Sequence, residues 1–154
     1  MRFNIKVPFF RQEAWYTCGP ACMRMILAFL RIIKTEGEIT EVCDTTELGT
    51  TPTQISEAFA ILGIKASSVK NTNIEELKNE IKEGRPVIVL IDPSSINGGI
   101  SGFGHFIVIV GIKDGEIEYH DPDEPEGKYL KCDFEAFIRA WNSSRCWMIK
   151  IEKE

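Results

Sequence analysis

Residues 12 to 22 read QEAWYTCGPAC, and the interpretation of the whole chain starts from them. From Cys22 to Ile33 the sequence is apolar on almost every side, which predicts a central, buried helix that starts near Cys18. Thr17 stands where a helix cap is expected, and Pro20 falls in the first turn, where its missing N–H costs nothing. The sequence therefore places a cysteine at the N-terminus of a buried helix.

This position gives Cys18 a candidate chemical role. A helix N-terminus presents unpaired backbone N–H groups and the positive end of the helix dipole, and both stabilise a thiolate. Gln12 lies six residues earlier, on the extended segment that leads into the helix. Its side-chain amide and the Cys18 backbone N–H could together stabilise an oxyanion, and losing one such donor costs about 10²–10³ in rate. The alternative for Cys18 is an ordinary buried thiol.

A base for Cys18 must come from one of two histidines, His105 and His120. His105 opens an apolar strand, and His120 lies in the alternating stretch EIEYHD over residues 116–121. The face of this second strand that carries its Ile and Tyr should be buried, which turns His120 to solvent and Asp121 inward. An inward carboxylate needs a partner, and His105 is the natural one, as in a catalytic triad.

The register of the hairpin around residues 114–115, Asp-Gly, decides whether His105 and Asp121 can meet. A two-residue turn sets their side chains on opposite faces of the sheet. A three-residue loop over residues 113–115, or an equivalent bulge, pairs Asp121 with Ile107 and sets both side chains on one face, within diagonal reach. We therefore predict the three-residue loop or a bulge that has the same effect.

The remaining pattern predicts helices first and an antiparallel meander afterwards, which is an α+β fold in a single domain over residues 1–154. The helical part covers about 12–84 and the β-rich part about 85–154. Residues 94–104 hold four glycines and suggest a mobile loop that could cover a cleft. The other expected elements are an extended segment at 4–10, helices at 52–62, 74–84 (capped by Asn73) and 133–141, and strands at 64–69, 86–91, 129–132 and 146–151.

Composition excludes several classes of protein. The 154 residues are 44% hydrophobic and 27% charged, as in an average globular chain, and no apolar run approaches the roughly 20 residues of a membrane span. The net charge of -5 makes nucleic acid an unexpected partner. The N-terminus shows no signal-peptide pattern, and five irregularly spaced cysteines do not suggest a disulfide framework. We expect a cytoplasmic chain with reduced thiols.

Cys22 follows Cys18 by one helical turn. We interpret it as a core thiol, since the pair is not completed to a closed zinc set and a redox role has weak support. No metal or cofactor is expected. Trp15 and Tyr16, beside Cys18, either shape a substrate pocket or pack at the entry of the helix. Three further cysteines are interpreted as buried core residues: Cys43, Cys132 and Cys146.

Taken together, QEAWYTCGPAC, the segment GHFIVIVG around His105 and the pair Asp121-Pro122 resemble the bacteriocin-processing (double-glycine leader) peptidase family of papain-like cysteine peptidases. The resemblance spans about residues 7–147. It implies the papain-like cysteine peptidase fold, with a buried N-terminal helix packed on an antiparallel sheet. It also implies Cys18 as nucleophile, His105 as base, Asp121 as the residue that orients the base, and Gln12 as oxyanion donor.

The activity implied by the resemblance is hydrolysis of peptide bonds through a Cys-His-Asp triad and a thioester intermediate. Two alternatives stay open at this point. An acyl or peptidyl transferase would use the same thioester with an amine as acceptor, and a peptide-binding module would keep the fold without catalysis. In each case the expected partner is a peptide or protein, and the oligomeric state is left open.

Overall fold

The computed structural model describes residues 2–96 and 104–152. Within these residues it contains the following helices: α1 (Cys18–Phe29), α2 (Glu36–Cys43), α3 (Pro52–Ile61), α4 (Ile74–Lys82), α5 (Phe134–Asn142) and the short 3-10 helix η1 (Pro93–Ser95). The strands are β1 (Arg2–Asn4), β2 (Ala66–Val69), β3 (Val87–Ile91), β4 (His105–Lys113), β5 (Glu116–His120), β6 (Leu130–Asp133) and β7 (Met148–Ile151).

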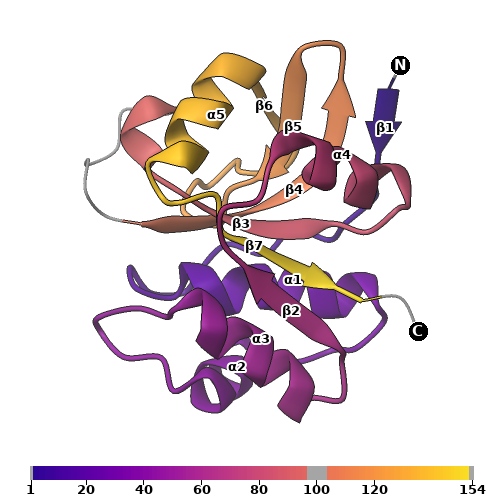
Figure 1. The fold of residues 1–154 in the computed structure, drawn as a ribbon. Helices are drawn as coiled ribbons and strands as arrows, with labels where there is room; N and C mark the ends of the chain where they lie inside the picture. The colour runs from indigo at the N-terminus through magenta and orange to yellow at the C-terminus, as the bar shows by residue number, and fades with distance from the viewer. Residues whose placement is uncertain (1, 97–103, 153–154) are drawn as a thin grey trace.

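The strands form a single seven-stranded sheet in the order β2-β7-β3-β4-β5-β6, with β1 paired to β4. Every pairing is antiparallel. Figure 1 shows α1, α2 and α3 on one side of the sheet and α4 and α5 on the other. The predicted α+β fold, with a buried N-terminal helix on an antiparallel sheet, is thus confirmed. In the described part of the chain, no helix has the length and apolar character needed to cross a membrane.

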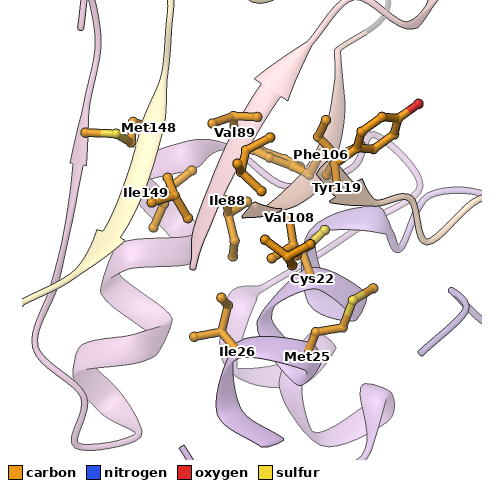
Figure 2. Close-up of a cluster of buried hydrophobic side chains, with 14 of the residues drawn as sticks. Cys22, Met25, Ile26, Ile88, Val89, Phe106, Val108, Tyr119, Met148 and Ile149 are labelled. Atoms are coloured by element: carbon orange, nitrogen blue, oxygen red, sulfur yellow. The ribbon is translucent and has the colours of Figure 1, made fainter. Parts of the chain in front are cut away.

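Helix α1 is fixed against the sheet by its apolar side chains. Cys22, Met25 and Ile26 are buried, and Figure 2 shows them facing Ile88 of β3 and Val108 of β4. Each large aliphatic side chain buried in this way contributes about 1.5–3 kcal/mol. The helix ends at Phe29, earlier than the predicted Ile33, because the left-handed backbone of Arg31 (φ 66°) turns the chain away. This packing determines where the N-terminus of α1 lies.

Helix α2 was not expected from the sequence. Its start is a capping box, in which the Thr35 side chain accepts from the Glu38 N–H while the Glu38 carboxylate accepts from the Thr35 N–H. The signal was present, since threonine followed three residues later by glutamate is typical of a helix start. The expected helix starting at Pro52 and the cap at Asn73 are confirmed. Of the expected loop at 94–104, residues 97–103 lie outside the described residues.

The β4–β5 hairpin has the predicted register by the second of the two predicted routes. Lys113 pairs with Glu116, so the turn holds two residues and the three-residue loop is absent. The equivalent bulge is present instead, because the register shifts by one residue at Val110. Continued one step beyond the end of β5, this register sets Asp121 opposite Ile107. The side chains of His105 and Asp121 therefore share one face of the sheet, as expected.

His120 corrects one prediction, because its side chain is fully buried and does not point to solvent. Its Nε2–H donates to the Val7 carbonyl at 2.8 Å, and its Nδ1 accepts from the Tyr129 N–H at 3.0 Å. The rings of Phe9 and Tyr129 pack against the imidazole edge to face. The segment that follows β1 thus covers the face of β5 that the alternating pattern predicts to be exposed to solvent.

We expect His120→Gln to lower the free energy of unfolding near neutral pH by about 1–3 kcal/mol, because ring contacts and hydrogen bonds are lost. Burial lowers the pKa of His120, so below the ordinary value of about 6.5 the unfolded chain binds a proton that the folded chain resists. The stabilisation from His120 is therefore present above that pH and is lost as the pH falls. Urea unfolding at about pH 7.5 and pH 5 measures both effects. An equal difference between wild type and variant at the two pH values would contradict the linkage.

Candidate active site

The structure places Cys18 at the first residue of α1, where its side chain is half-buried. Thr17 precedes it at the cap position, but its hydroxyl makes no cap bond, contrary to our expectation. Instead the hydroxyl accepts from the Ala14 N–H at 3.0 Å and donates to the Ala14 carbonyl at 2.9 Å. Thr17 therefore closes the loop of residues 12–17 that leads to the cysteine.

His105 and Asp121 form the closest polar contact of the site. His105 Nε2 lies 2.7 Å from Asp121 Oδ1, and the carboxylate is almost completely buried. The same carboxylate oxygen accepts from the Asp123 N–H at 2.9 Å, and the Asp121 N–H donates to the Gly127 carbonyl. These bonds hold Asp121 at the end of β5. Because Nε2 of His105 is bonded to Asp121, the other ring nitrogen of His105 is the one that can interact with Cys18.

The His105 imidazole is set up to carry a positive charge. Burial lowers its pKa, but the hydrogen bonds with Asp121 and Cys18 raise it, and the net effect raises the pKa of His105 to about 10. The imidazolium is thus the stable form at neutral pH. The contact with Cys18 places this cation beside the thiol at the N-terminus of α1.

Gln12 lies in the same loop as Cys18, and its side chain is half-buried. Its backbone N–H donates to the Pro122 carbonyl at 2.9 Å, which ties the loop to the segment after Asp121. Its side-chain Nε2 donates to the carbonyls of Ala14 (2.9 Å) and Trp15 (3.2 Å). Its Oε1 is buried and has no hydrogen-bond partner among the described residues. The amide orientation is therefore set by the loop itself.

The other cysteines are separate from this chemistry. Cys22 is fully buried, and burial raises its pKa well above the usual value, which keeps it a neutral core thiol. Cys43 is also buried, and its thiol contacts the Met23 sulfur at 3.3 Å. Cys132 and Cys146 are only half-buried, which corrects their assignment to the core. Among the described residues, no group of three or more His, Cys, Asp or Glu side chains could hold a metal ion.

Trp15 lies shortly before Cys18 in the sequence, and its large aromatic side chain faces solvent. It is 75% exposed and contacts the Tyr16 ring edge to face. A residue that packs at the helix entry would be covered, so packing is not its main role.

Several supporting groups of the site were not predicted from the sequence. Glu36 of α2 is buried, and both of its carboxylate oxygens accept from the Glu13 N–H. The carbonyl of Pro122 and the N–H of Asp123 hold Gln12 and Asp121. All three are contacts between distant segments or backbone groups, which carry no local sequence pattern.

A cysteine at a helix N-terminus and a histidine bonded to a carboxylate, on an antiparallel sheet, define the papain-like class of peptidase folds. Residues 4–148 match the Peptidase C39 like family, and the chain belongs to that family. The expected resemblance to the double-glycine leader peptidases is confirmed by this match and by the solved structures that share the fold.

Three solved structures illustrate this likeness. A structure described as a C39-like peptidase from Bacillus anthracis has a TM-score of 0.84 at 18% identity, over 100% of this chain and 98% of that one. The peptidase domain of Streptococcus ComA, a bi-functional ABC transporter, has 0.77 at 24% identity, over 98% and 100%. A double glycine motif protease from an AMS/PCAT transporter, in complex with a leader peptide, has 0.73 at 22% identity, over 97% and 95%. At these identities the likeness establishes the fold.

Proposed function

We propose that this chain is a cysteine peptidase that uses Cys18 as nucleophile, His105 as general acid and base, and Asp121 to orient the histidine. The observation that carries the proposal is the 2.7 Å bond between His105 Nε2 and the buried Asp121 carboxylate, in a histidine that also contacts Cys18. Buried carboxylate, imidazole and thiol in this order form the arrangement that activates a sulfur nucleophile.

The first half of the reaction forms a thioester. The Cys18 thiolate attacks the carbonyl carbon of the peptide bond, and the carbonyl oxygen becomes an oxyanion. The His105 imidazolium then gives its proton to the leaving nitrogen, the C–N bond breaks, and an amine leaves. Asp121 keeps the ring in orientation throughout, because its Oδ1 stays bonded to Nε2.

The second half releases the acid. Neutral His105 takes a proton from water, the resulting hydroxide attacks the thioester carbonyl, and the C–S bond breaks to regenerate the thiolate and the imidazolium. The oxyanion of each half-reaction is stabilised by the Cys18 N–H and by Gln12. To donate to the oxyanion, the Gln12 amide exchanges one of its bonds, to the Ala14 or the Trp15 carbonyl, for a bond to the substrate oxygen.

We propose a peptide as the substrate. A structural neighbour of this chain was solved in complex with a leader peptide, which shows that this fold accepts a peptide chain in that protein. The exposed Trp15 beside Cys18 provides an apolar surface against which a substrate side chain can pack.

The proposal is tested by incubating the protein with a diverse peptide library, with and without an added amine, and by weighing the products. Hydrolysis gives products heavier by one water in total, whether or not the amine is present. Products that carry the amine in place of water would identify an acyl transferase. A wild type that binds peptides but cleaves none would indicate a binding module and overturn the proposal.

A further inference from the structure

The loop of residues 12–17 carries the Gln12 amide and leads to Cys18, and it rests on a buried carboxylate from another helix. Glu36, the first residue of α2, is only 3% exposed. Both of its carboxylate oxygens accept from the Glu13 N–H at 3.1 Å. A carboxylate at this depth is tolerated only when it is hydrogen-bonded.

Glu36 is not needed to start α2. That task is performed by the capping box of Thr35 and Glu38, which occupies the cap position and the exposed side of the first turn. An acidic residue whose only role was a favourable interaction with the helix dipole could stay exposed to solvent. The burial of Glu36 against the Glu13 N–H therefore points to a role in the loop.

The bonds on either side of Gln12 fix its backbone. Its own N–H donates to the Pro122 carbonyl, next to Asp121, and the following N–H, that of Glu13, donates to Glu36. The residue that supplies the amide is thus held between the segment that carries Asp121 and helix α2.

A third element, α1, holds the same segment by its side chains. The Arg24 guanidinium lies 4.0 Å above the ring centre of Phe10, and its Nη1 lies 3.4 Å from the Glu13 carboxylate. Because the Glu13 side chain of this ion pair is 64% exposed, the pair contributes little by itself. The buried bond from the Glu13 N–H to Glu36 is the stronger of the two restraints.

We propose that Glu36 is a positioning residue of the active site: by fixing the Glu13 N–H, it holds the Gln12 amide where it can stabilise the oxyanion. The inference rests on the proposed peptidase function. An oxyanion donor acts only when it lies within hydrogen-bond distance of the position that the oxyanion takes. A displacement of about 1 Å in a catalytic group can cost about 10²-fold in rate, so a lost anchor under this loop affects kcat.

The test compares Glu36→Ala with Glu36→Gln and with Glu38→Ala as matched control. We expect Glu36→Ala to lower kcat by about 10–10²-fold with KM changed far less, because the oxyanion exists only in the transition state. Glu36→Gln keeps an oxygen that accepts the Glu13 N–H, so it should recover most of the lost kcat. Glu38→Ala removes a cap of the same helix, so it should lower Tm and leave kcat unchanged.

Alkylation of Cys18 by iodoacetamide supplies a second readout, since that displacement forms no oxyanion. Glu36→Ala should be alkylated at the wild-type rate, which shows that the thiol and its histidine are intact. If the wild type cleaves peptides and Glu36→Ala does so with the same kcat, the inference is overturned while the proposed function stands. The same holds if kcat falls equally in Glu38→Ala, or if the alkylation rate falls with kcat. A wild type that cleaves no peptide would instead refute the proposed function, and the inference with it.

Discussion

Cys18→Ala is expected to remove peptide hydrolysis, with kcat falling by roughly 10⁵-fold or more, to the level left by binding alone. The reason is that alanine supplies no nucleophile, so the thioester cannot form. Alanine fits at the first residue of α1, where Cys18 is only half-buried, and the fully buried side chains of that helix come after it. The folded structure should therefore persist, which circular dichroism and thermal unfolding can verify. The rate is measured by mass spectrometry of peptide products.

Cys132→Ala is the matched control for the loss of a thiol, because Cys132 is half-buried on the edge strand β6. It should cleave peptides at the wild-type rate. Activity that survives in Cys18→Ala, or that disappears in Cys132→Ala, would show that Cys18 is not the nucleophile.

Asp121→Ala is expected to lower kcat by about 10²–10⁴-fold, because His105 loses both its orientation and the anion that stabilises its charge. Asp121→Asn should lose less, since an amide oxygen can still accept from Nε2. Removal of the negative charge favours the neutral imidazole, so the pKa of His105 should fall from about 10. The alkaline limb of the pH profile of kcat/KM should therefore move to lower pH in Asp121→Asn.

Glu126→Ala serves as the control for this pair, because Glu126 is an exposed acidic residue of the same segment. It should leave both the rate and the pH profile unchanged. An Asp121→Asn variant whose alkaline limb stays where it is in the wild type would mean that Asp121 does not set the charge of His105.

Much of the site could be predicted because several of its residues stand in recognisable local sequence patterns. Cys18 is marked by the proline and the apolar run that follow it, and Asp121 by the alternation of its strand. Their meeting depended on a bulge, which we expected at the turn and which lies at Val110. A signal for the true position was present in Gly111, because glycine inside a strand often marks a bulge or a close approach of backbone. A Cβ on Gly111 would lie 2.9 Å from the Phe3 carbonyl oxygen of β1.

What could not be predicted comes from contacts between distant segments. His120 follows the alternation of an exposed side chain, but the segment after β1 covers it. The Val7 carbonyl in that segment bonds Nε2, and the Tyr129 N–H before β6 bonds Nδ1. The partner of Glu36 is a backbone N–H from a loop more than twenty residues away. Such polar groups can be buried because they form hydrogen bonds with a partner from elsewhere in the chain. A single sequence contains no pattern that identifies this partner.

The central proposal is that His105 activates Cys18 as a nucleophile, and the pH dependence of Cys18 alkylation tests this most directly. The rate at which iodoacetamide modifies Cys18 is measured by peptide mass between about pH 6 and pH 9, in the wild type and in His105→Ala. We predict fast modification at pH 6 in the wild type and a large loss of rate there in His105→Ala. A Cys18 that reacts only near the free-cysteine pKa of about 8.5, equally in both proteins, would contradict the account.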